Sequence, residues 1–155
     1  MARTPKPYSR RQERFGRAFT KYMARFNTWL YRVSKGRFGN RFPGGAPICL
    51  LATKGRKSGV TRTTPLLFLA DGDNVVVVAS QGGMPKHPEW YLNLVADPNV
   101  SVQIRDEDRA MTARTADASE KQELWPRLTA MYKGYDTYQA RTTRDIPVVI
   151  CTPRT

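Results

Sequence analysis

TRTTPLLFLADGDNVVVVAS, residues 61–80, is the stretch that decides the fold class. Asp71-Gly72 lies between two runs rich in Leu, Val and Thr. Such a dipeptide is typical of a tight hairpin turn, so the stretch predicts strands at Thr61–Ala70 and Asn74–Ser80. Val75–Val78 is unbroken valine, which is typical of a strand covered on both faces. The stretch therefore indicates an antiparallel sheet with other elements packed against it.

Further strands are predicted on both sides of this hairpin. They cover Pro47–Thr53, Val100–Arg105, Ala110–Thr115 and Ile146–Cys151. Val100–Arg105 alternates apolar and polar residues and pairs with Ala110–Thr115 across 106–108, which predicts a second hairpin. Six strands at short spacing predict an α+β protein built on a small antiparallel barrel whose ends are plugged by helices.

Two helices are predicted in the same part of the chain. The first covers Pro88–Ala96, between the two hairpins. The second covers 118–132 and begins at a capping box formed by Asp117 and Glu120. Pro126 predicts a kink or a break in this second helix, because proline lacks the N–H that an α-helix needs there.

The net charge of +13 is concentrated at the N-terminus. Residues 1–41 hold twelve Lys or Arg against one acid, Glu13, and so carry +11, which leaves +2 for the rest of the chain. We therefore divide the chain into a basic N-terminal segment, 1–41, and a nearly neutral body, 42–155.

A stripe of apolar side chains at spacings of three and four predicts a helix over Ser9–Lys35 in the basic segment, capped by Ser9 and ended by Gly36 and Gly39. The stripe consists of Phe15, Phe19, Tyr22, Met23, Phe26, Trp29, Leu30 and Val33. Such stripes usually pack on the protein's own body or on a second subunit. A second interpretation is peripheral contact with an anionic membrane surface. Nucleic acid is not expected as a partner, because no recognised binding motif accompanies the charge.

The rest of the composition excludes several classes of protein. No apolar run approaches the roughly 18 residues of a membrane span, and no secretion signal is present, so we expect a cytoplasmic protein, with any membrane contact on the inner face. Cys49 and Cys151 lie in apolar runs, as buried free thiols do. His87 is the single histidine, so a metal site is not expected and a Ser-His-Asp or Cys-His scheme is disfavoured.

Three local clusters are candidates for binding. TKGRKSG at 53–59 follows a predicted strand, and its backbone N–H groups and cations suit an anion, although a solvated hairpin tip has the same composition. Ser80 precedes QGG, where two glycines permit a ligand to approach the backbone, unless this is a plain loop. Tyr132, Tyr135 and Tyr138 recur every three residues and form one aromatic surface if that stretch is helical.

A series of motifs follows along the chain: FNTWLYR, GRKSG, PLLFL, DG, VVVAS, QGG, HPEWYLNLVADP, WPRLTAMY and IPVVIC. In this order, the motifs resemble the deazaflavin-dependent nitroreductase family of actinobacteria over nearly the whole chain. The resemblance implies a split β-barrel of the flavin-binding type. It also implies coenzyme F420, an 8-hydroxy-5-deazaflavin with a phosphate and an oligoglutamate tail. The implied reaction is hydride transfer from reduced F420 to a quinone or a nitro compound such as a nitroimidazole.

The resemblance also implies roles for individual residues. It assigns the tail and phosphate to Lys54, Arg56, Lys57 and Arg62. It places around the ring Thr64, Pro65, Val78, Ala79, Ser80, Trp90, Tyr91 and Asn93. Tyr132, Tyr135 and Tyr138 would wall the substrate pocket, with Ser80 and Tyr135 as the catalytic candidates.

Two positions depart from the family pattern, and two alternatives stay open. Gln81 stands where Lys is common and Arg141 where an aromatic residue is common, so the resemblance does not carry the family's acceptor preference over to this chain, above all its activity on nitroimidazoles. One alternative is an FMN-dependent reductase of the same fold, although four cations exceed what a single phosphate needs. The other is a deazaflavin-binding protein without catalysis, which would need no tyrosine-lined pocket.

Overall fold

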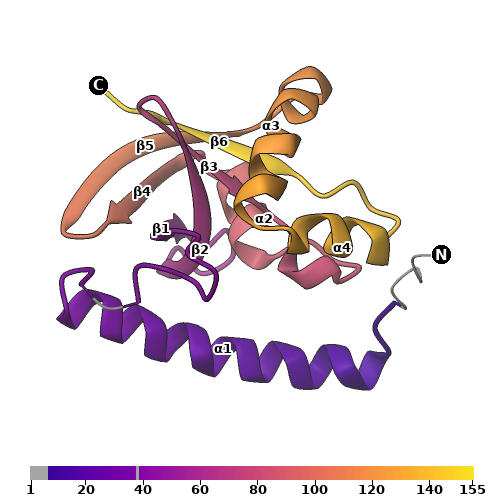
Figure 1. The fold of residues 1–155 in the computed structure, drawn as a ribbon. Coiled ribbons are helices and arrows are strands. Elements are labelled where there is room, and N and C mark those ends of the chain that lie inside the picture. Colours follow the sequence, from indigo (N-terminus) through magenta and orange to yellow (C-terminus); the bar gives the residue numbers. More distant parts are fainter. Residues whose placement is uncertain (1–6, 38) are drawn as a thin grey trace.

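The computed structural model describes residues 7–37 and 39–155, without the side chains of 15–24, 26 and 27. Its strands are β1 Ile48–Lys54, β2 Thr61–Asp71, β3 Asn74–Val78, β4 Asn99–Ile104, β5 Glu107–Thr115 and β6 Val148–Pro153. Its helices are α1 Arg10–Val33, α2 Glu89–Ala96, α3 Ala118–Met131 and α4 Gly134–Arg141, with a 3-10 turn, η1, at Gln81–Gly83. Figure 1 shows α1 as a long rod along one side of the strands, with α3 and α4 on another.

The six strands close into a barrel in the order β1-β2-β3-β6-β5-β4, and every neighbouring pair is antiparallel. The first hairpin turns between Asp71 and Asn74, which pair with each other, and β1 closes the barrel by pairing with β4. The predicted α+β barrel and its first hairpin are therefore confirmed.

Strand β3 is covered on both faces, as its unbroken valines predict. Val75 and Val77 face the barrel interior and Val76 and Val78 face the layer of α3 and α4, and none of the four is more than 5% exposed. A fully buried valine contributes roughly 1.5 to 3 kcal/mol. This strand consequently joins two hydrophobic clusters, one inside the barrel and one under the helices.

Strand β6 covers Val148–Pro153 rather than the predicted Ile146–Cys151, and two further predicted boundaries also differ. The second hairpin is tighter than predicted, because Arg105 adopts a left-handed backbone with φ 57° and Ile104 pairs directly with Glu107, where strand β5 begins. Strand β3 ends at Val78 rather than at Ser80. Both changes come from backbone conformations at single residues, which a composition pattern does not specify.

The two C-terminal helices refine the predicted one. The capping box of Asp117 and Glu120 starts α3 as predicted, and α3 runs through Pro126 without a break. The tyrosine stretch is interrupted after Met131. Tyr132 therefore ends α3, whereas Tyr135 and Tyr138 both lie on α4.

The N-terminal helix has the predicted ends. Ser9 forms a capping box with Gln12, and the N–H of Gly36 donates to the carbonyl of Tyr31 at 2.8 Å. Gly36 has φ 73°, and a Cβ there would lie 2.4 Å from the Cα of Arg105. The end of α1 is therefore seated against the β4–β5 turn by a glycine that no other residue can replace without movement.

Two described members of the predicted apolar stripe of α1 are exposed rather than packed on the body. Trp29 is 58% exposed and Val33 is 64% exposed, whereas Tyr31 is buried, packs with Ile48 and Leu50, and accepts the backbone N–H of Arg105. Packing on the body is therefore wrong for these two residues, and this end of α1 is instead held by Tyr31 and by Arg32, which donates to Oγ1 of Thr63. The side chains of Phe15, Phe19, Tyr22, Met23 and Phe26 lie outside the described residues. The boundary at residue 41 stays a prediction.

Cys49 and Cys151 are free and buried in the barrel interior, as predicted. Burial raises the pKa of the Cys49 thiol well above its usual range and that of Cys151 to about 12. Both groups therefore stay protonated and unreactive at neutral pH.

Neither a membrane-spanning helix nor a metal-binding cluster is present among the described residues. No helix among 7–37 and 39–155 combines the length and the apolar character that a bilayer crossing requires. Over the same ranges, no three His, Cys, Asp or Glu side chains gather as a metal ion would need.

Candidate functional site

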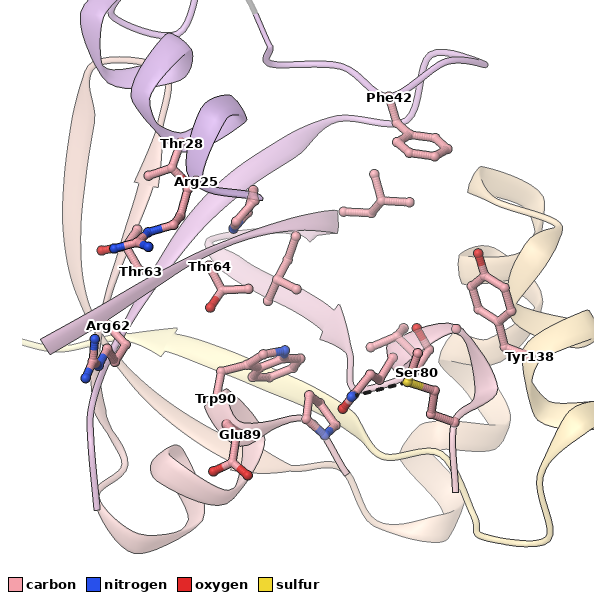
Figure 2. A pocket seen from close by; sticks show the side chains of 18 of the residues that line it. Arg25, Thr28, Phe42, Arg62, Thr63, Thr64, Ser80, Glu89, Trp90 and Tyr138 are labelled. Atoms are coloured by element: carbon pink, nitrogen blue, oxygen red, sulfur yellow. Dashed lines mark hydrogen bonds between the residues drawn. The ribbon is translucent and has the colours of Figure 1, made fainter. Parts of the chain in front are cut away.

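A cavity of about 1200 Å³ opens between α1 and strand β2 on one side and η1, α2 and α4 on the other. Figure 2 shows that it has two unlike ends, with Arg25 and Arg62 at one end and Phe42 and Tyr138 at the other. Thr64 lies between them. We call Arg25, Arg32 and Arg62 the cationic end, and Phe42, Ser80, Tyr132, Tyr135 and Tyr138 the aromatic end.

The cationic end draws its side chains from two elements that are far apart in the sequence. Arg62 comes from β2, and Arg25 and Arg32 come from α1. Arg32 donates from Nη2 to Oγ1 of Thr63 at 2.9 Å, which fixes its guanidinium against the strand. Three guanidinium groups at one end suit an anionic ligand, since each offers several N–H donors in a fixed plane.

The predicted basic turn lies beside the cavity rather than in its wall. Arg56 pairs with Glu89 at 2.6 Å, and both its side chain and its backbone N–H donate to Oδ1 of Asn93. Asn93 is 5% exposed and donates in turn to Thr53 at 3.4 Å, so it ties the turn to α2. Lys54, Arg56, Lys57 and Asn93 are absent from the cavity lining, and of the four predicted cations Arg62 alone lies in it.

The residues predicted to surround the deazaflavin ring also divide into those that line the cavity and those that do not. Thr64, Pro65, Val78, Ser80 and Trp90 line the cavity. Ala79 does not, because strand alternation turns it into the barrel interior, where it is fully buried. Tyr91 bonds through its hydroxyl to Thr115 at 2.9 Å, outside the lining.

The aromatic end is a cluster of phenols. The hydroxyls of Tyr132 and Tyr138 are 2.7 Å apart, and the ring of Tyr132 lies 5.1 Å from that of Tyr135 and 5.6 Å from that of Phe42, centroid to centroid. Burial is the main cause that raises the pKa of Tyr135 and of Tyr138 above the usual range. These phenols are therefore protonated donors at neutral pH.

The Tyr135 hydroxyl is available to a ligand. Tyr135 is 4% exposed and lines the cavity, and among the described residues none hydrogen-bonds to its hydroxyl. Ser80 has the same property within the described part of the chain, since only its backbone is engaged there: its carbonyl accepts from Arg144 at 2.8 Å and from Gly83 at 2.9 Å. Two residues with hydroxyl groups thus line the cavity, and neither hydroxyl has a hydrogen-bond partner among the described residues.

The turn that carries Ser80 touches the helix that carries the tyrosines. Gly83 has φ 79°, and a Cβ there would lie 2.4 Å from the carbonyl oxygen of Tyr138. The close approach of η1 to α4 thus depends on this glycine. It brings together Ser80 and Tyr135, which are far apart in the sequence.

Sequence reasoning missed several residues of the site. Arg25, Thr28 and Arg32 of α1 line the cavity, as do Tyr8 and Phe42. The sequence did contain a signal for the three α1 residues, because their spacing of three and four places them on one face of a helix. Nothing in the sequence indicates that this polar face, rather than the aromatic stripe, turns toward the barrel.

The two departures from the family pattern have different positions. Gln81 lines the cavity, with φ 44°. Arg141 does not line it, but donates to the hydroxyl of Tyr8 at 2.6 Å. Arg141 therefore acts on the cavity indirectly, through Tyr8, which lines it.

Comparisons with known proteins point to one family. The model of the F420H(2)-dependent quinone reductase family matches residues 23–153. An F420H(2)-dependent quinone reductase of Mycobacterium tuberculosis is 38% identical over 135 residues, which cover 85% of this chain and 91% of the relative.

Two solved structures are similar as well. An F420-H2 dependent reductase shares 42% identity with a TM-score of 0.63, over 68% of this chain and 93% of the other. A structure described as a domain-swapped dimer shares 36% identity with a TM-score of 0.66, over 82% of this chain and 93% of the other. Together with the closed barrel, the first of these confirms the predicted split β-barrel.

Proposed function

The chain belongs to the F420H(2)-dependent quinone reductase family, whose cofactor is reduced coenzyme F420, and we propose that it transfers hydride from reduced F420 to a quinone. The family confirms the resemblance that the sequence motifs indicate. One observation carries the proposal for this chain: one cavity has guanidinium groups at one end and, at the other, hydroxyls that no described residue hydrogen-bonds.

The residues present fit the cofactor. Its phosphate and glutamate tail are anionic, which suits Arg25, Arg32 and Arg62. Its flat ring suits the apolar walls formed by Val78 and Trp90. A cavity of about 1200 Å³ exceeds the range of roughly 300 to 1000 Å³ that is usual for one small ligand, so there is room for an acceptor too.

The basic turn extends this binding surface beyond the cavity. A tail of several glutamates is longer than the phosphate alone and leaves the cationic end toward solvent. Lys54 and Lys57 are exposed beside that end, on the turn that Arg56 and Asn93 fix to α2. We assign the outer glutamates to these lysines, with a contribution that salt screens.

When bound, reduced F420 supplies a hydride from C5 of its ring. Reduction of a quinone to a hydroquinone takes one hydride and one proton, and negative charge develops on the acceptor's oxygen. The protonated hydroxyl of Tyr135 donates a hydrogen bond to that oxygen, and the hydroxyl of Ser80 donates a second. The apolar walls at Val78 and Trp90 would reduce the water around the reacting atoms.

The experiment that tests this function is a binding and turnover series on the purified chain. Oxidised F420 and FMN are titrated separately, and reduced F420 is then mixed with a menaquinone analogue or a nitroimidazole. We expect F420 binding and turnover with the quinone. Binding of FMN alone would favour the FMN-dependent alternative, and F420 binding without turnover of either acceptor would favour a non-catalytic carrier.

Helix α1 is proposed to contact a membrane surface. Trp29 and Val33 expose apolar side chains beside the cations Arg32 and Lys35, the combination that binds anionic lipid headgroups. Trp29 and Arg32 also line the cavity, so contact there would bring a lipid-dissolved quinone close to its entrance.

A matched pair of variants tests the membrane contact. Val33 on α1 is 64% exposed and Val95 on α2 is 60% exposed, so Val33→Asp and Val95→Asp add the same charge at equally open positions. We expect Val33→Asp to reduce sedimentation with phosphatidylglycerol vesicles roughly tenfold and Val95→Asp to leave it unchanged. Equal sedimentation of both variants and the parent would contradict the contact.

A further inference from the structure

Arg144 holds both ends of the turn that carries Ser80. Its Nε donates to the carbonyl of Met84 at 2.8 Å, its Nη2 to that of Ser80 at 2.8 Å, and its Nη1 to that of Ala79 at 3.2 Å. Nη1 also lies 3.1 Å from Nδ1 of His87. Because arginine only donates, that ring nitrogen accepts, and the imidazole is neutral.

The turn needs such a restraint. Gln81, Gly82 and Gly83 follow one another with φ of 44°, 64° and 79°, all in the left-handed region. A non-glycine residue there is strained and persists only when its surroundings fix it. Within the turn itself, Gly83 donates to Ser80 at 2.9 Å and Met84 to Gln81 at 3.2 Å. The three carbonyl contacts of Arg144 add the external support.

The backbone of Arg144 is fixed to the tyrosine helix. Gln139 of α4 donates from Nε2 to the carbonyl of Arg144 at 2.8 Å and accepts the N–H of Ile146 at 3.0 Å. Arg144 therefore connects α4, which carries Tyr135, to the turn that carries Ser80. This connection is independent of the contact that Gly83 makes with α4.

We infer that Arg144 is a positioning residue that sets the Ser80 hydroxyl relative to the tyrosine hydroxyls of α4. Arg144 does not line the main cavity, so it acts on the acceptor through Ser80 rather than by touching it. The inference rests on the proposed function, because it assigns Arg144 a part in the same hydride transfer. A purely structural residue would stabilise the fold equally but would have no coupling to Ser80.

The first test compares two conservative variants. Arg144→Lys keeps the charge and the stem but cannot reach three carbonyls in one plane. Arg114→Lys is the control, because Arg114 makes a two-pronged pair with Glu120, 2.7 Å at each contact, away from the cavity. We expect Arg144→Lys to lower kcat with a menaquinone analogue about tenfold at unchanged F420 affinity, and Arg114→Lys to leave kcat unchanged. Unchanged kcat in Arg144→Lys would overturn the inference.

A double-mutant cycle with Ser80→Ala separates positioning from structure. If Arg144 acts through Ser80, its effect should shrink from about tenfold to less than about twofold in the Ser80→Ala background. An equal loss of kcat in both backgrounds would overturn the inference. If the parent protein does not oxidise reduced F420 with any quinone, the proposed function fails instead, and the next measurement still tests the support of the turn.

That measurement needs no cofactor. Hydrogen exchange of the Gly83 and Met84 amides reports opening of the turn in the unloaded protein. We expect faster exchange there in Arg144→Lys, with α2 amides unchanged, and no change in Arg114→Lys. Exchange at parental rates in Arg144→Lys would show that the turn holds without Arg144 and would overturn the inference.

Discussion

The two ends of the cavity are held in place by different means. At the aromatic end, Ser80 and Tyr135 lie on buried elements that touch through Gly83 and are joined by Arg144. At the cationic end, exposed arginines from α1 and β2 lie close together. Among the described residues, one hydrogen bond, from Arg32 to Thr63, holds them in place. The first end is preorganised by packing, and the second attracts charge by long, solvated side chains.

This difference matches what each end has to do. Hydroxyls that stabilise charge on a reacting oxygen must be placed within fractions of an ångström, which buried packing achieves. Guanidinium groups that hold a flexible anionic tail tolerate movement, because Coulomb attraction varies slowly with distance. Substitutions should therefore act on rate at one end and on affinity at the other.

The largest expected effect is on the packing of the aromatic end. Gly83→Ala places a Cβ 2.4 Å from the Tyr138 carbonyl at φ 79°, so we expect a loss of about 2 to 5 kcal/mol in unfolding free energy. Gly72→Ala is the control: φ is 60°, but no atom lies within 4 Å, and only the backbone cost of about 1 to 2 kcal/mol applies. Urea unfolding measures both, and equal losses would remove the evidence that this contact holds the end together.

A smaller effect is expected at the cationic end. Arg32→Met should weaken F420 binding roughly tenfold at low salt and less at high salt, since part of the attraction is screened. Arg37→Met removes the same charge from an exposed position just after α1, outside the cavity, and should change the dissociation constant little. Fluorescence titration at two ionic strengths measures both, and equal weakening would mean that net charge, not the lining, attracts the cofactor.

The smallest effect is a pH dependence at the support of the aromatic end. Burial, and then the charge of Arg144, lowers the pKa of His87 below its usual 6.5. Arg144, Tyr91, Lys86 and Glu89 are the ionisable groups around it. Because the folded-state pKa lies below the unfolded one, His87 costs no stability above about pH 6.5, and stability declines as pH falls below that value.

His87→Gln measures this contribution. The variant should show a smaller decline of the urea midpoint between pH 7.5 and pH 5 than the parent. Identical pH dependence in both proteins would place the acid sensitivity elsewhere and would remove His87 from the support of the turn.

The sequence predicted the aromatic end better than the cationic end. Tyr132, Tyr135, Tyr138 and Ser80 all line the cavity, although Tyr132 ends α3 and the other two tyrosines lie on α4. The predicted cations of the basic turn, by contrast, lie outside the cavity lining, and Arg56 forms an ion pair with Glu89. A basic motif has the same sequence whether its side chains face a ligand or bulk solvent. The motif alone therefore does not show which cations line a binding site.

The barrel itself was predictable, and the position of α1 was not. Val75–Val78 requires cover on both faces, and the structure supplies it. For α1, the apolar stripe favoured packing through Trp29, whereas the contact runs through Tyr31 and Arg32. These are long-range contacts, with Thr63 of β2 and with Arg105, and no local pattern records them.

One crossed measurement tests whether the two ends of the cavity separate binding from chemistry. Arg62→Ala and Tyr135→Phe are compared with the parent in two quantities, the F420 dissociation constant and kcat with a menaquinone analogue. Tyr135→Phe keeps the buried ring and removes only the hydroxyl.

We expect Arg62→Ala to raise the dissociation constant roughly tenfold at low salt with kcat within about twofold of the parent. We expect Tyr135→Phe to lower kcat about ten- to a thousandfold with F420 affinity unchanged. The account is contradicted if both variants change the same quantity, or if Tyr135→Phe turns over at the parental rate.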